Sequence, residues 1–293
     1  MIKLRVLFVL FSGALVLGWA APAAAHAGGL VASDARSRVI AVTPAIPGLE
    51  VATIEDGARL RVRNHTPGPV SVSAGGGAAT PAVVAAGDEL TWIDTRGTPE
   101  GRKVPAGRSV GWSLVLEAAG TPVTVTGELT GEQPPAPIPW WVAVIVTGLA
   151  VPLGAKRLRR PDLALTAAGV VAMAASVTHV AGSTLAVESA PPLGTFLNAA
   201  GINLLAWPLI AGGAVAVLRG RPAGVLAICA GAALTAVFVL PDVTSLHRAV
   251  VPFAGPATVE RVLVVLALGL GAGVAVAGAS VLRTLARESA EVR

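Results

Sequence analysis

The residues that could do chemistry in this chain are few, and the histidines are the most informative of them. The 293-residue sequence holds one cysteine, two methionines and no tyrosine. This scarcity excludes an intrachain disulfide framework, a multi-cysteine zinc site and a cysteine-ligated cluster. The four histidines are His26, His65, His179 and His247. Any metal site must therefore be built mainly from imidazole and carboxylate groups.

His26 is a candidate for the amino terminus of the mature chain. The run Ala-Pro-Ala-Ala-Ala-His-Ala offers small-residue cleavage sites after Ala25 and after Ala27. Cleavage after Ala25 would give His26 a free amine beside its imidazole, a nitrogen chelate that suits Cu(II). Cleavage after Ala27 would instead make Gly28 the first residue and would remove this site.

Further copper ligands would have to come from elsewhere in the chain. The candidates near the amino-terminal side are one histidine and three aspartates: His65, Asp34, Asp88 and Asp94. The simpler interpretation of His65 is a solvated turn residue. Met173 is the only methionine within the apolar stretches, so a methionine-lined Cu(I) path is not favoured.

Four polar residues accompany the apolar stretches of the second half: His179, His247, Asn198 and Asn203. Polar groups within a membrane span usually face other helices or a cavity. A small-solute transporter would use His179, Asn198 and Asn203 along its path. The simpler interpretation of His179 is a hydrogen bond between helices.

One string resembles a catalytic motif but lacks its context. Gly107-Arg-Ser-Val-Gly111 matches the G-x-S-x-G pattern of serine hydrolases, which requires a strand-to-helix turn and a histidine within reach. Here the string leads into residues that alternate as a strand does. His65 is the only histidine within residues 28–130. The sequence contains no Walker loop, HExxH or dinucleotide fingerprint. We expect no catalytic residues and no enzymatic activity.

A leader and five apolar stretches set the predicted organisation. Residues 1–27 combine Lys3, Arg5, an apolar run and the cleavage region, and are predicted to be a signal peptide rather than an uncleaved anchor. Each later stretch approaches the roughly 20 residues that cross a hydrocarbon core. The predicted transmembrane helices are 138–155, 163–182, 195–218, 222–240 and 260–283, followed by a tail at 284–293.

Charges beside these stretches predict their orientation. Nine Lys and Arg residues follow the first, third and fifth stretches, whereas the opposite loops hold only Arg248, with Arg261 at the start of the last stretch. The positive-inside rule then places the C-terminus in the cytoplasm and residues 26–137 outside. We predict a multi-pass plasma-membrane protein, embedded in the lipid bilayer, in which Pro208 kinks the third stretch.

Residues 28–130 are predicted to form an extracytoplasmic all-β sandwich of the immunoglobulin-like or CopC-like kind. Leu60 and Val62 alternate with arginines, and Val123 and Val125 alternate with threonines. Period-two alternation gives one buried and one solvated face, and turn residues separate about seven such runs. The proline-rich segment 131–137 is predicted to be a semi-rigid linker.

The net charge of +5 reports orientation rather than a nucleic-acid partner. Residues 26–137 hold nine Lys and Arg against eleven Asp and Glu, whereas residues 138–293 hold eleven against six. The excess of positive charge therefore lies at the predicted cytoplasmic edge. Because no basic face accompanies it, we predict no binding of nucleic acid.

The run after the leader carries a recognisable pattern of residues. The pattern comprises Ser33, Arg36, Arg38, Val39, Val42, Pro44, Pro47, Gly48, Leu49, Glu50 and Val51, and ends in the strand 60–64. From 26 to 66 the chain resembles an uncharacterised group of exported, membrane-anchored actinobacterial proteins. The resemblance implies a β-rich outer region and C-terminal membrane anchoring. Longer members carry a Glu-Pro-Tyr segment and a Trp-His-Asp-His stretch, both absent here.

A second resemblance concerns the mature amino terminus. The start His26-Ala27, with Leu30 and Ser33 following, is similar to that of CopC-type copper-binding proteins. It implies a β-sandwich and copper as the bound metal. We therefore expect an envelope protein that binds or relays copper at the outer face. The alternatives are a scaffold that docks an envelope protein partner, and a small-solute transporter.

Overall fold

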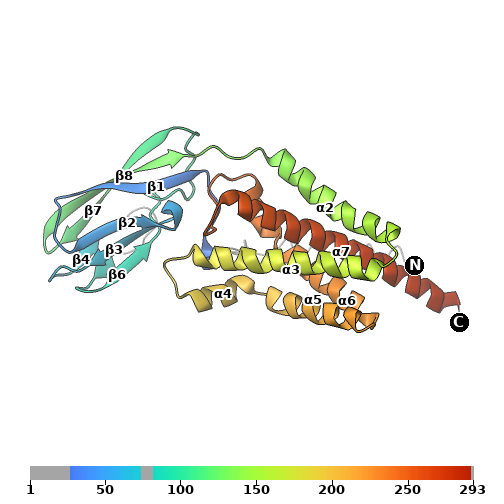
Figure 1. Ribbon diagram of the computed structural model, residues 1–293. Coiled ribbons are helices and arrows are strands. Elements are labelled where there is room, and N and C mark those ends of the chain that lie inside the picture. Colours follow the sequence, from blue (N-terminus) through green and yellow to red (C-terminus); the bar gives the residue numbers. More distant parts are fainter. Residues whose placement is uncertain (1–26, 74–81, 292–293) are drawn as a thin grey trace.

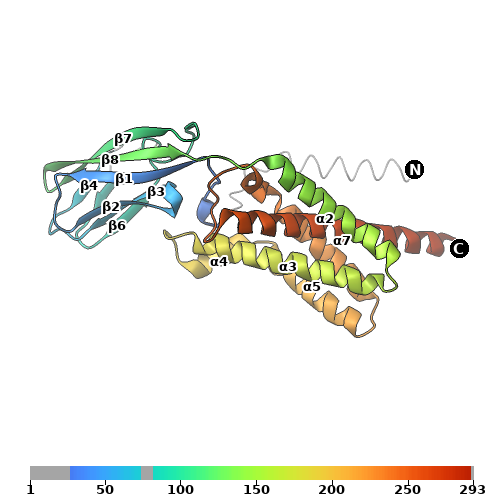
Figure 2. The same cartoon turned by 45° about the horizontal axis from the view of Figure 1, so that its top comes forward.

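The computed structural model of the chain describes residues 27–73 and 82–291, with side chains as far as Ala279. An amino-terminal β-region is followed by helices (Figure 1). The predicted signal peptide, except for Ala27, lies outside the described residues. Figure 2 shows the β-region at one end of an elongated molecule and the carboxyl-terminal end of the chain at the other.

The larger sheet of the β-region has five antiparallel strands in the order β1-β8-β7-β4-β5. Its strands are β1 (Ala35–Thr43), β4 (Val70–Val72), β5 (Ala82–Val84), β7 (Ser109–Ala118) and β8 (Thr121–Gly131). β7 and β8 are joined by a two-residue turn at Ala119 and Gly120, both with positive φ. That conformation matches the twist of the flanking strands, so this hairpin is fixed by local sequence.

The smaller sheet has three antiparallel strands in the order β2-β3-β6. They are β2 (Leu49–Ile54), β3 (Arg59–Asn64) and β6 (Glu89–Trp92), with the short 3-10 helix η2 (Glu55–Gly57) between β2 and β3. In β3 the buried positions are Leu60, Val62 and Asn64. The predicted alternation of this strand is therefore confirmed by its burial.

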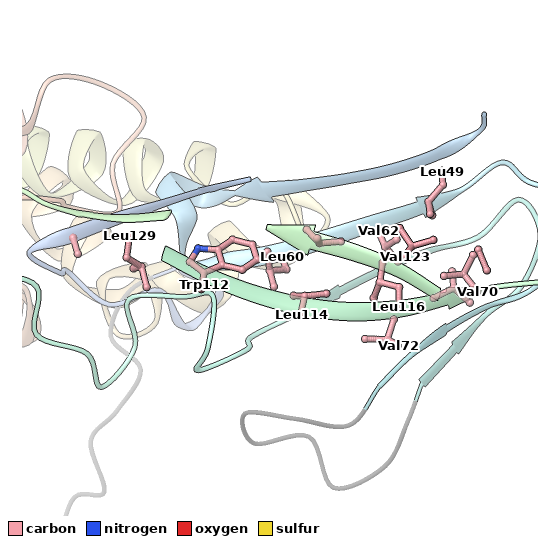
Figure 3. Packing of buried hydrophobic residues seen from close by; sticks show 14 of the residues in the cluster. Leu49, Leu60, Val62, Val70, Val72, Trp112, Leu114, Leu116, Val123 and Leu129 are labelled. Carbon is pink, nitrogen blue, oxygen red and sulfur yellow. The ribbon is translucent and has the colours of Figure 1, made fainter. Parts of the chain in front are cut away.

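Both sheets contribute to one hydrophobic core (Figure 3). Leu60 and Val62 of the smaller sheet and Leu116, Val123 and Val125 of the larger sheet are fully buried. These side chains alternate with partly buried or exposed ones along their strands, so the burial of one face stabilises both sheets together. The coarse prediction of an antiparallel β-region is confirmed.

The indole of Trp112 lies within this core, between Leu129 and Leu60 (Figure 3). Its Nε1 donates a hydrogen bond to the hydroxyl of Ser37 at 3.1 Å, and that hydroxyl donates to the carbonyl of Gly97. A Cβ atom on Gly127 would lie 2.2 Å from the Trp112 ring. Glycine is therefore required beneath the indole.

The second half of the chain is helical. Its elements are α2 (Pro137–Arg157), α3 (Pro161–Leu185), α4 (Pro192–Ala200), α5 (Asn203–Leu218), α6 (Ala223–Phe238), the 3-10 helix η3 (Leu240–Leu246) and α7 (Ala257–Glu291). Helices α2, α3 and α6 all pack against α7. Three helices are long and apolar enough to cross a membrane, or up to five spans form if each bent pair counts as one.

One predicted stretch, 195–218, is broken inside, and another, 222–240, ends where the chain bends. α4 and α5 meet at 70°, and α6 and η3 meet at 56°. The first break follows Gly201, which has a positive φ, whereas Pro208, the expected kink, lies inside α5. The last stretch is longer than expected, because α7 continues to Glu291 through the predicted tail.

Glycines allow α7 to approach α2 closely. A Cβ atom on Gly269 would lie 2.9 Å from the Val144 carbonyl oxygen, and one on Gly273 would lie 2.4 Å from the Gly148 carbonyl oxygen. Small residues at this spacing permit backbone contact between helices. Within this chain the glycine spacing therefore serves internal packing.

Candidate functional site

A polar face of α3 points into the helices near their β-region end. Ser176, His179 and Ser183 are buried and share one side of the helix, because they are three and four residues apart. The Ser176 hydroxyl accepts a hydrogen bond from Nε1 of Trp207 at 3.2 Å. This face carries the only buried histidine among the described residues, His179, into the space between the helices at that end.

His179 lies between two buried carboxylates. Its Nδ1 is 2.8 Å from Oε1 and 3.0 Å from Oε2 of Glu260, and its Nε2 is 3.1 Å from Oδ2 of Asp242. All three side chains are at most 7% exposed. Ionisable groups are costly to bury unless they are paired. The contacts of His179 with both carboxylates therefore allow all three side chains to be buried.

The beginning of α7 sets the position of both carboxylates. Glu260 occupies its first turn, and the next residue, Arg261, donates hydrogen bonds to the carbonyls of Ser245 at 2.9 Å and Arg248 at 2.8 Å. These bonds hold the end of η3, the element that carries Asp242, against α7. The Arg261 guanidinium therefore holds Asp242 and Glu260 in position on either side of His179.

A small cavity adjoins this cluster. It holds about 10 Å³, close to the space that one water molecule needs. Asp242 lines it but Glu260 does not, so the cavity lies on the Nε2 side of His179. Ser183 and Asn203 also line it, and a buried oxygen of each, Oγ and Oδ1, has no hydrogen-bond partner among the described residues.

The amino-terminal segment forms part of the cavity wall. Ala27 lines it and is 1% exposed, within the 3-10 helix η1 (Ala27–Gly29). Gly28 has a positive φ, and a Cβ atom there would lie 2.9 Å from Val187. Its carbonyl accepts a hydrogen bond from Arg59 of β3. The segment is thus fixed between the β-region and the helices.

Glu55 joins the β-region to the loop after α3. Its side chain is fully buried, and Oε1 accepts hydrogen bonds from the Glu188 amide at 3.1 Å, the Ser189 amide at 3.0 Å and the Ser189 hydroxyl at 2.6 Å. Oε2 lies 3.3 Å from Nη1 of Arg59. A buried carboxylate with these partners fixes the orientation of the two regions.

A second junction lies at the start of β1. The Asp34 carboxylate pairs with the Arg248 guanidinium and accepts a hydrogen bond from the Ala249 amide. The backbones of Ser33 and Val250 exchange two hydrogen bonds, of 2.9 and 2.8 Å. Polar contacts thus hold the β-region to the helices on two sides.

Asp94 stabilises a loop of the β-region, away from the helical cavity. Burial favours its neutral form, but hydrogen bonds from Arg96 to both carboxylate oxygens outweigh this effect and lower the pKa of Asp94 below its usual value. Its backbone carbonyl accepts from Gly97 and Thr98. This predicted alternative copper ligand is thus already bound to an arginine.

The structure separates the residues that the sequence put forward. His179 and Asn203 line one cavity. His65 is exposed in the turn after β3, His247 is exposed at the end of η3, and Asn198 is exposed on α4. His26 lies outside the described residues, and only its neighbour Ala27 can be located.

Three parts of the site were missed in the sequence. Asp242 and Glu260 lie 63 and 81 residues from His179, and Glu55 bonds across 134 residues to Ser189. One signal could have found the first two, because residues 138–293 contain only six acids, and an ionisable residue beside an apolar stretch marks a functional candidate.

The fold and the site define the class of protein by its architecture. A β-region of two antiparallel sheets is held by polar contacts to helices that are apolar enough to cross a membrane. Comparison with family models, curated proteins and solved structures gives no match. Among the described residues no group of three or more His, Cys, Asp and Glu is arranged to hold a metal ion. The two resemblances of the amino-terminal run stay predictions.

Proposed function

We propose that this chain is a multi-pass plasma-membrane protein with an exported β-sandwich, and that its processed amino terminus binds copper at the outer face. The observation that carries the proposal is the burial of Ala27 in the wall of the His179 cavity. Consecutive Cα atoms are about 3.8 Å apart. Cleavage after Ala25 would therefore attach the free amine and imidazole of His26 to a residue that already lines this cavity.

The surroundings of His179 suit a metal ligand. Metal-binding histidines usually donate their second ring N–H to a carboxylate, which fixes the tautomer and the ring. Glu260 is in position to accept from Nδ1, and Nε2 lies on the cavity side beside Asp242. His26 would supply two nitrogens, His179 a third and Asp242 an oxygen, a donor set typical of Cu(II).

The orientation of the protein is proposed from charge and hydropathy. The β-region adjoins the ends of α3 and α7 that carry few cations, whereas Lys156, Arg157, Arg219 and Arg221 lie at the other ends of their helices. The positive-inside rule favours a cytoplasmic location for those other ends. The shared core of two antiparallel sheets supports a sandwich.

The size of the cavity favours binding over passage. A space of about 10 Å³ is enough for one water-sized group and not for a larger solute. Asn203, a predicted path residue, lines this space, and its Oδ1 has no hydrogen-bond partner in the part of the chain that the structure describes. We therefore place binding of a single ion ahead of solute transport, with a non-metal scaffold as the remaining alternative.

The proposal is tested on the full chain, produced with export and purified in detergent. Amino-terminal sequencing should give His26 as the first residue. Cu(II) titration followed by calorimetry and electron paramagnetic resonance should give a Kd below about 10 μM, equivalent to about 7 kcal/mol. His26→Gln and His179→Gln should each weaken binding at least about tenfold, and Glu260→Gln by about 10- to 100-fold, as for other outer-shell carboxylates.

Two exposed histidines provide matched controls. His247→Gln should leave the Kd and the nitrogen hyperfine pattern unchanged, since His247 is exposed and does not line the cavity. His65→Gln, at the ligand predicted from sequence in the β-region, should likewise leave the Kd unchanged, since His65 is exposed and does not line the cavity. A mature chain beginning at Gly28, or the absence of binding below 10 μM, would reject the copper site and leave the scaffold.

A further inference from the structure

A groove lies between the β-region and the helices, distinct from the histidine cavity. It encloses about 690 Å³, within the range of small-molecule sites. Its lining consists of the amino-terminal segment 29–34, Ala58 and Arg59 at the start of β3, Ile93 after β6, the loop 99–105 of the β-region, and Arg248 before α7. None of the groups in the histidine cluster contributes to this groove, so the two sites can be tested separately.

Positive charge predominates in the groove. Its lining contains four basic and two acidic residues: Arg59, Arg102, Lys103, Arg248, Asp34 and Glu100. Arg248 is paired with Asp34, and Arg59 with Glu55. Arg102 uses one nitrogen to donate to the Arg96 carbonyl. Lys103 is exposed and forms no hydrogen bond or ion pair with the described part of the chain. The groove therefore holds cationic donors available to an anion.

Exposed apolar side chains share the groove with these cations. Val31 is 71% exposed and Ile93 is 40% exposed, and both belong to the lining. Large exposed aliphatic side chains beside basic ones favour a ligand that has an anionic part and an apolar part. A small inorganic anion would leave the apolar side of the groove unused.

The groove lies close to the ends of the apolar helices. The carbonyl of Asp34, at its edge, accepts a hydrogen bond from the Glu132 amide, five residues before α2 begins at Pro137. Arg248, on the other side, precedes the start of α7 at Ala257 by nine residues. If these helices cross the bilayer as proposed, the groove opens at the level of lipid headgroups.

We propose that this groove binds the phosphate headgroup of an anionic phospholipid from the outer leaflet. Arg102 and Lys103 would hold the phosphate by charge-assisted hydrogen bonds, which are stronger than neutral ones, while Val31 and Ile93 contact the apolar part of the lipid. The proposal rests on the membrane orientation given above but not on copper. The bound lipid would fill the space between the two regions.

Native mass spectrometry of the detergent-solubilised full chain tests this site, with phosphatidylglycerol, phosphatidylcholine and glycerol 3-phosphate as probes. We expect phosphatidylglycerol to bind at least about tenfold more tightly than the other two. The double substitution Arg102→Gln/Lys103→Gln should weaken its binding by about tenfold, the loss expected for a charged hydrogen bond. The single change Lys103→Gln, at an exposed residue, should weaken binding about threefold without affecting the fold.

The matched control is Arg219→Gln/Arg221→Gln, which removes two exposed cations between α5 and α6 at the end far from the β-region (Figure 1). It should leave lipid binding unchanged. Equal binding of phosphatidylcholine, or equal loss in the control, would overturn recognition at the groove. Equal binding of glycerol 3-phosphate would assign the groove to a soluble anion. A chain that stays soluble without detergent would refute the membrane orientation itself, whatever the lipid result.

Discussion

Glu55→Ala is the sharpest test of how the β-region is held to the helices. One oxygen of this fully buried carboxylate accepts three hydrogen bonds from Glu188 and Ser189. Each hydrogen bond to a charged group contributes about 1.5–3 kcal/mol. Because the loop relaxes and water enters when the side chain is truncated, we expect about 3–5 kcal/mol, the range for a buried charge pair that loses one partner.

The loss should be local, and hydrogen exchange measures it directly. The Ser189 amide donates to Glu55, so its protection reports both the loss of this hydrogen bond and the opening of the junction. A change of about 3 kcal/mol corresponds to roughly two orders of magnitude in exchange rate, while amides in β7 and β8 should keep their protection. The control is Glu117→Ala, at an exposed position of β7, with an expected effect below about 0.5 kcal/mol.

The reasoning would be refuted if Glu55→Ala changed the protection of Ser189 by less than tenfold. Loss of protection throughout the β-region would also contradict it, because it would mean that Glu55 supports the β-fold rather than the junction. Limited proteolysis gives an independent reading, since a released β-region should be cut after α3, near Ser189.

Two further predictions concern the interior of the β-region. Asp94→Asn should destabilise the full chain by about 1–3 kcal/mol at pH 7. The pKa of Asp94 is lowered in the folded state. The difference in stability should therefore persist above the unfolded pKa of about 3.9 and disappear as the pH falls through the folded-state pKa. Melting curves of both proteins from pH 7 to pH 3 measure this difference. Gly127→Ala should cost at least about 1–3 kcal/mol in chemical denaturation, since the new Cβ meets the Trp112 ring at 2.2 Å. In Gly111→Ala the new Cβ would lie 3.9 Å from its nearest neighbour, the Gly127 carbonyl oxygen, so this variant should be nearly as stable as the parent. Equal losses of stability in the two glycine variants would contradict the packing argument.

Local patterns in the sequence predicted strands and helices but not the places where the chain bends between them. The alternation at Leu60 and Val62 reflects side chains that point to opposite faces of one strand, and it needs no distant information. The break at Gly201 was missed because apolar composition continues through it. A positive φ distinguishes this glycine from those inside the helices, and the sequence alone does not show it.

The histidine site was predictable only in part for a different physical reason. His179 was identified because a polar residue in an apolar helix needs a partner. Which carboxylates would pair with it depended on the position of η3 against α7, which Arg261 fixes through backbone carbonyls. Contacts of a side chain with distant backbone leave no periodic trace in a sequence. The same holds for Glu55, whose partners are mostly amides of a remote loop.

The link between Asp34 and Arg248 also bears on the order in which the protein is made. These residues lie 214 positions apart, and the second emerges from the ribosome only shortly before the last helix. The β-region can fold before the helices are complete, since domains fold as units during synthesis. The Glu55 junction can form once the loop after α3 has been made, but the second junction must wait for the loop before α7. A chain that stops short of that loop would therefore hold its β-region by one junction and leave the start of β1 open to proteolysis.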